Sequence, residues 1–89
     1  MQMPVAAGNR AVKDGSLPKL IQAFTEKAKP EAIYFGGFDG MRTMIAVFDM
    51  ASPAEIPQLA EPFFTGLDAT IQFTPVMNAA DLEKGLSGL

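Results

Sequence analysis

The chain has 89 residues, of which 48% are hydrophobic and 19% charged, and its formal net charge is −3. These values are typical of one small globular domain, residues 1–89, and exclude an intrinsically disordered chain. The seven basic residues are scattered, whereas a nucleic-acid-binding surface needs a cluster, so we expect no nucleic-acid partner. The longest apolar run, Met44–Phe48, is far shorter than the ~20 residues of a membrane span, so no membrane partner is expected either.

The sequence contains neither cysteine nor histidine, which limits its chemistry. Disulfide bonds, thiol nucleophiles, Ser-His triads and histidine-ligated haem or zinc are excluded. The acidic residues are spread singly and form no calcium-binding loop, so we expect no metal site and no cofactor. The first residues lack the charged region and long apolar segment of a secretory signal, and we expect a cytoplasmic protein.

Residues 1–28 are expected to form a strand and then a helix. The short, mostly apolar stretch Met1–Ala6 is interpreted as the first strand, although Pro4 cannot donate a hydrogen bond to a central ladder. Ser16 is a suitable N-cap for the helix that follows, and Pro30 prevents its continuation. The buried stripe of this helix, at helical spacing, is Leu17, Leu20, Ile21, Phe24 and Ala28.

Asp39-Gly40 is the strongest turn signal in the chain and predicts a hairpin of Ile33–Phe38 with Met41–Met50. A two-residue turn sets the register, in which Phe38 opposes Met41, Gly36 opposes Thr43, Phe35 opposes Met44 and Tyr34 opposes Ile45. One face then carries Ile33, Phe35, Met44, Ala46 and Phe48, and the other carries Tyr34, Phe38, Met41, Thr43, Ile45, Val47 and Asp49. Neither face is polar enough to be left in water.

The C-terminal half predicts a helix, a strand and a short helical tail. A capping box, Ser52-Pro53-Ala54-Glu55, begins a helix that two internal prolines should bend and that Gly66 should end. A fourth strand is expected over Ala69–Val76 and a tail helix, capped by Asn78, over Ala79–Leu86.

The element order predicts an α+β, ferredoxin-like βαββαβ fold with a short C-terminal helix. Its antiparallel four-stranded sheet should carry two helices on one face, because the crossovers are right-handed. The other face would expose apolar side chains, and such a patch usually marks an interface. We therefore expect the chain to be its own partner, in a homodimer through that sheet face.

Three segments carry a resemblance to known proteins: Lys29–Phe35, Ala60–Phe64 and Phe73–Ala79. They resemble a bacterial family of uncharacterised small proteins within the dimeric α/β-barrel group of ferredoxin-like folds. The resemblance implies a sheet-to-sheet homodimer that encloses a small barrel. The wider group includes muconolactone isomerase-like enzymes, antibiotic-synthesis monooxygenases, stress-responsive barrel proteins and haem-degrading enzymes. No catalytic motif of that group is matched here, and no histidine is present to bind haem.

The candidate site residues lie on the second sheet face. Asp49 is either a general base at the rim of an apolar cavity or a solvated residue at a strand end. Tyr34 either presents its hydroxyl to a ligand or fills the dimer interface. Thr43, Ile45 and Gln72 complete the expected lining of a ligand cavity between the sheets.

Three functions are compatible with these residues. The first is a homodimeric domain that binds a small apolar metabolite in the inter-sheet cavity. The second is a cofactor-free isomerase or monooxygenase acting on a cyclic or aromatic metabolite, with Asp49 as the base and Tyr34 as the polarising donor. The third is a purely structural dimerisation module.

Overall fold

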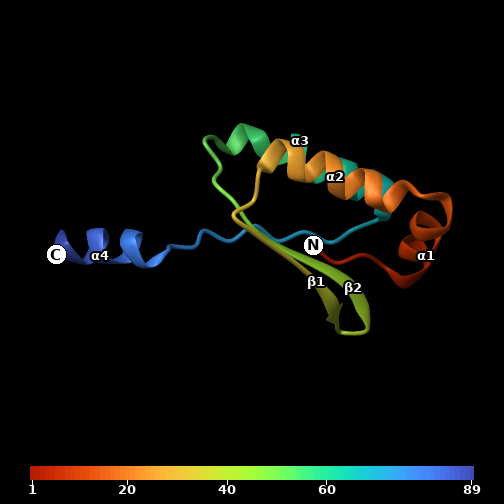
Figure 1. Ribbon diagram of the computed structural model, residues 1–89, viewed down its shortest axis with the longest axis horizontal. Helices are drawn as coiled ribbons and strands as arrows, with labels where there is room; N and C mark the ends of the chain where they lie inside the picture. The colour runs from red at the N-terminus through yellow and green to blue at the C-terminus, as the bar shows by residue number, and fades with distance from the viewer.

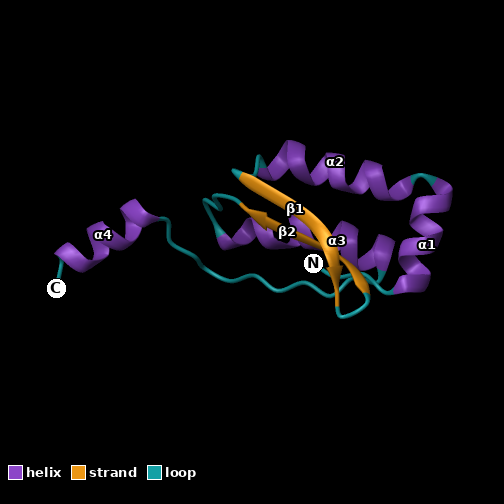
Figure 2. Cartoon of the chain, turned by 60° about the horizontal axis from the view of Figure 1, so that its bottom comes forward, coloured by secondary structure: helices purple, strands orange, loops and turns teal.

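The computed structural model describes all 89 residues and contains four α-helices, one 3₁₀ turn and one two-stranded antiparallel sheet. In chain order these are α1 (Val5–Asp14), α2 (Ser16–Ala28), β1 (Ala32–Phe38), β2 (Met41–Val47), η1 (Pro53–Glu55), α3 (Ile56–Leu67) and α4 (Ala79–Ser87). Helices α2 and α3 pack together on one side of the hairpin, and α1 contacts both of them and β2 (Figure 1). Figure 2 shows the C-terminal residues running away from this body as an extended segment that ends in α4.

The corner between α1 and α2 is made by Gly15, whose φ of 79° favours glycine. The predicted N-cap, Ser16, is instead the first residue of α2. Its backbone N–H donates to Oδ1 of Asp14 at 2.8 Å, so Asp14 provides the carboxylate that accepts from the start of the helix. Helix α2 ends at Ala28, as the sequence predicts, with Lys29 in the left-handed conformation and Pro30 following.

The predicted register of the hairpin is confirmed at every pair from Ala32 opposite Val47 to Phe38 opposite Met41. The second strand ends at Val47, so its predicted extension to Met50 is wrong. Asp39 and Gly40 both have positive φ, 56° and 75°, as a two-residue type I′ turn requires. This turn matches the right-handed twist of the strands, which is why so short a signal determines the pairing of the whole hairpin.

The core lies between the hairpin and helices α2 and α3. Leu67 is fully buried, and Phe63 and Leu59 lie one and two turns earlier on the same side of α3. Phe24 of α2 packs edge-on against Phe48, with 5.6 Å between the ring centroids, and in a tilted arrangement against Phe63 at 5.7 Å. Of the stripe predicted for α2, Phe24 is buried in this core, and Leu17, Leu20 and Ala28 pack against it partly buried.

The segment before α3 contains the predicted capping box. The Ser52 hydroxyl accepts from the Ala54 N–H at 3.2 Å, and the Glu55 carboxylate accepts from the Ser52 N–H at 3.0 Å. The helix tolerates Pro62 in its interior and continues through Leu67, so the predicted end at Gly66 is wrong. Gly66 serves close packing, because a Cβ at this position would lie 3.1 Å from Cδ1 of Leu20 on α2.

The predicted four-stranded ferredoxin-like sheet is wrong, and with it the dimeric α/β barrel. The expected first strand, Met1–Ala6, contributes only two isolated bridges, both at Gln2, since Pro4 has no N–H to donate and the chain enters α1 at Val5. The expected fourth strand, Ala69–Val76, is likewise reduced to Thr70, which exchanges backbone hydrogen bonds of 2.8 and 2.7 Å with Gln2. Beyond Thr70 no further residue of this segment forms a bridge.

The predicted tail helix is confirmed, with Asn78 and Asp81 forming a reciprocal cap. It contacts no other helix or strand of the chain. The molecule is consequently elongated, 51 Å along its longest axis, with a radius of gyration of 15.0 Å. A compact domain of 89 residues would have a radius of about 12 Å.

Candidate functional site

The candidate site is the face of the hairpin turned away from α2 and α3, here called the outer face. Alternation along the two strands assigns to it Tyr34, Gly36 and Phe38 from β1 and Met41, Thr43, Ile45 and Val47 from β2. Tyr34 and Ile45 are cross-strand partners, and their side chains are 66% and 46% exposed. Phe38 is also exposed. Large apolar side chains thus lie in solvent on the outer face, and Phe35 on the opposite face of the hairpin is 58% exposed as well.

A glycine shapes the end of the outer face nearest the turn. A Cβ on Gly36 would lie 3.2 Å from Cε2 of Phe38, so the aromatic ring lies across the position where a side chain would stand. The ring therefore covers the strand beside Thr43, the partner of Gly36, and adds apolar surface next to Tyr34 and Ile45. The result is a continuous aromatic and aliphatic surface along the hairpin.

A polar row borders the outer face. Gln2 bridges Thr43 on one side and Thr70 on the other, and directly opposed residues of antiparallel strands share a face. The Gln2 amide donates from Nε2 to the Phe38 carbonyl at 3.2 Å, and the Thr43 hydroxyl donates to the Met41 carbonyl at 3.1 Å. Thr43 is 9% exposed. Because the Thr43 hydroxyl already donates a hydrogen bond within the chain, its proton is not free to bind a ligand.

The remaining predicted site residues are not brought together. Gln72 is exposed and lies two residues beyond Thr70, at the start of the unpartnered C-terminal segment. Asp49 is exposed after the end of β2 and takes part in no ion pair. Neither of the two main hollows of the molecule is lined by Tyr34, Ile45, Asp49 or Gln72. Neither hollow therefore surrounds Asp49, the predicted base, or Tyr34, the predicted donor.

The larger hollow, about 180 Å³, lies on the opposite, helix-facing side of the hairpin. Its apolar lining is Met1, Met3, Leu17, Ile21, Phe35 and Met44. Arg42 also lines it and donates from Nη2 to Oδ1 of Asn9 at 3.1 Å. The guanidinium passes so close to Gly8 on α1 that a Cβ there would lie 2.6 Å from Nη1. This hollow was not predicted, although the pairing of Phe35 with Met44 opposite the α2 stripe was the signal that could have located it.

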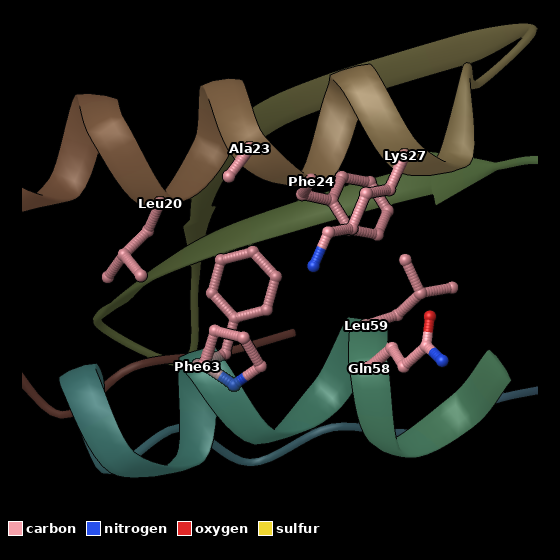
Figure 3. Close-up of a pocket in the computed structure, with 8 residues that line it drawn as sticks. Leu20, Ala23, Phe24, Lys27, Gln58, Leu59 and Phe63 are labelled. Carbon is pink, nitrogen blue, oxygen red and sulfur yellow. The ribbon is translucent and has the colours of Figure 1, made fainter.

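The smaller hollow, about 20 Å³, lies between α2 and α3 (Figure 3). Leu20, Ala23 and Phe24 project into it from α2 and Leu59 and Phe63 from α3. Its volume is close to that of a single water molecule, so it is a packing gap in the core and not a ligand site.

The C-terminal tail, defined as residues 71–89, carries a second set of exposed apolar side chains. These are Phe73, Val76, Met77, Leu82, Leu86 and Leu89. Residues 71–77 make no backbone hydrogen bond, and α4 buries none of its residues. The tail therefore has apolar surface, and unpaired backbone groups, of the kind that usually find partners in a native protein.

Charged groups form no site. The one ion pair joins Arg10 and Asp68 at 3.7 Å between two exposed side chains, and no three acidic groups gather where they could hold a metal ion. Hydrogen bonding by Ser16, from its side chain and its backbone N–H, lowers the pKa of the Asp14 carboxyl. No helix has the length and apolarity needed to traverse a bilayer.

Comparisons of the chain with protein-family models, with curated proteins and with solved structures found no match. Inference about function therefore depends on the exposed apolar surfaces and on the larger hollow.

Proposed function

We propose that this chain acts as a homodimer and that the outer face lies in the dimer interface. The observation that carries the proposal is the amount of surface that a single copy leaves in water. One chain exposes 6354 Å², whereas a compact monomer of this mass would expose about 5,050 Å². The excess, about 1,300 Å², is larger than the ~800 Å² that each partner contributes to a standard protein interface.

The chemistry of the outer face favours a second copy as its partner. Tyr34, Phe38 and Ile45 are of the aromatic and aliphatic types found in the centre of interfaces. No charged side chain lies among the outer-face residues from Tyr34 to Val47. A closed two-fold contact would bring the same apolar surface of each copy together, which removes it from water without exposing a new edge.

Tyr34 provides a direct test, because the sequence contains one tyrosine and no tryptophan. Its intrinsic fluorescence reports on the outer face alone. Quenching by acrylamide should be efficient at concentrations where sedimentation equilibrium finds a monomer and should fall as the dimer forms. N-acetyl-tyrosinamide, measured at the same concentrations, is the control for inner-filter effects. A chain that remains monomeric at 100 μM, or a dimer in which Tyr34 quenching is unchanged, would overturn the proposal.

A second candidate function, binding of a small apolar molecule, is favoured by the hollow beside Met44. Its volume of about 180 Å³ is similar to the ~150 Å³ of an engineered apolar cavity known to hold benzene. We propose a single-ring ligand, with Arg42 at hand for a carboxylate substituent. This location differs from the inter-sheet cavity that the sequence suggested, and it lies on the helix side of the hairpin.

Methionine methyl NMR tests this second candidate within one sample. Met1, Met3 and Met44 line the hollow, whereas Met77 is exposed in the tail and acts as an internal control. Titration with toluene and with benzoate should shift the first three methyl signals and leave Met77 unchanged. A stronger effect of benzoate would indicate a contribution from Arg42. Uniform shifts, or none at millimolar probe, would eliminate the hollow as a binding site.

A further inference from the structure

We infer that the C-terminal tail, residues 71–89, is a dimerisation arm that packs on the second copy of this chain. The inference rests on the proposed homodimer and extends it by naming a second interface element. It follows from the size of the outer face, the state of the tail and the exposed surface of the whole chain.

The outer face alone is too small for a stable interface. Each strand of the hairpin has seven residues, which corresponds to a length of about 23 Å and, for two strands, a projected area of about 220 Å². A standard interface takes about 800 Å² of accessible surface from each partner. A stable interface of standard size therefore needs further surface from elsewhere in the chain.

The tail offers the additional apolar surface that the dimer interface needs. Helix α4 is nine residues long, and an isolated helix of this length is marginal in water unless it packs on something. Its capping box nevertheless defines its start, and Leu82 and Leu86 lie one turn apart on the same side of the helix. Leu89 follows just beyond the end of the helix. The side chain of Leu89 is 99% exposed and the helix touches nothing in its own chain.

The segment that leads to α4 carries this helix away from its own body, and the proposed homodimer makes a second copy its partner. Thr70 is the last residue whose backbone is paired with the body, and residues 71–77 extend away from it without a backbone hydrogen bond (Figures 1 and 2). These residues project the apolar helix to the end of a 51 Å long molecule. In a two-fold dimer both arms would be exchanged, so each copy would both donate an arm and receive one.

The first experiment changes only the arm. Leu82→Gln with Leu86→Gln removes its apolar stripe, and since neither residue touches the body, the fold of residues 1–70 should be unaffected. Glutamine has nearly the helix propensity of leucine, and Ala80→Gln with Lys84→Gln on the opposite side of α4 is the matched control. The dissociation constant from sedimentation equilibrium should rise at least about 100-fold in the leucine variant, and stay within about threefold of the native value in the control.

The second experiment identifies which body the arm contacts. A dimer of one isotopically labelled and one unlabelled chain allows NOEs between copies to be observed separately from those within a copy. We expect NOEs between copies from the methyl groups of Leu82 and Leu86 to residues 1–70. NOEs confined to one copy would overturn the exchange, and an unchanged dissociation constant for the leucine variant would overturn the arm itself, while the dimer through the outer face would stand. A native chain that never associates would overturn the homodimer, and the arm with it.

Discussion

Replacing Ile45 by threonine tests the outer face with the least disturbance of the monomer. The side chain is 46% exposed, and threonine keeps the β-branched shape that suits a strand. Complete burial of an isoleucine contributes about 1.5–3 kcal/mol, so covering the exposed half should contribute about 0.7–1.5 kcal/mol in each copy. A two-fold dimer buries the residue twice, which gives about 1.4–3 kcal/mol, or a dissociation constant raised about 10- to 150-fold.

The assay is sedimentation velocity over a concentration series, with circular dichroism to confirm that the fold is retained. Val12→Thr is the matched control, because Val12 is 52% exposed on α1 and lies outside the outer face. It should leave association unchanged. A change of less than twofold for Ile45→Thr, or an equal effect of Val12→Thr, would refute the assignment of the interface to the outer face.

Three further predictions concern the body of the molecule. Leu67→Ala should lower the free energy of unfolding by about 2–5 kcal/mol in urea denaturation, since Leu67 is fully buried. Leu89→Ala is the control: at protein concentrations below the dimer dissociation constant it should change the free energy of unfolding by less than about 0.5 kcal/mol. Gly40→Ala should cost about 1–2 kcal/mol by the same measurement, because φ is 75° there, and an unchanged midpoint would contradict the turn geometry. A ¹³C NMR titration should give the Asp14 carboxyl a pKa below its ordinary value of 3.8, and this pKa should rise in Ser16→Ala. The carboxylate then stabilises the fold above pH 3.8, and this stabilisation is lost as the pH falls through the lowered pKa. A lower pKa in Ser16→Ala would contradict the hydrogen bond.

The hairpin and the main helices could be predicted because their signals are local. The turn at Asp39-Gly40 requires positive φ at two successive residues, and this requirement alone determines the register that places Tyr34 opposite Ile45. The capping box at Ser52 could be predicted, since it consists of two side chains three residues apart that satisfy each other's backbone. Asn78 could be predicted as a cap, and the structure adds Asp81 as its reciprocal partner.

Whether Met1–Ala6 and Ala69–Val76 form strands could not be predicted from their own residues. A strand exists only if a neighbouring segment accepts its hydrogen bonds along its length. The first segment forms isolated bridges at Gln2 alone, to Thr43 and to Thr70, so Thr70 has one partner residue instead of a strand. The alternation of residues 69–76 predicts a fourth strand, and this prediction is wrong because the pairing that a strand needs depends on a distant part of the chain.

The candidate site divides in the same way. Composition and the hairpin register by themselves determined that histidine and cysteine chemistry is excluded and that Tyr34, Thr43 and Ile45 share one face. The tertiary structure decided that the Thr43 hydroxyl bonds within its own strand and that a hollow of about 180 Å³ lies beside Met44 on the helix side. It also decided that residues 71–77 make no backbone hydrogen bond, although Ile71 still packs against the core, and that α4 contacts no other helix or strand. The physical reason is that turns and caps are satisfied by neighbours in sequence, whereas burial, cavities and strand partners depend on contacts between segments far apart in the chain.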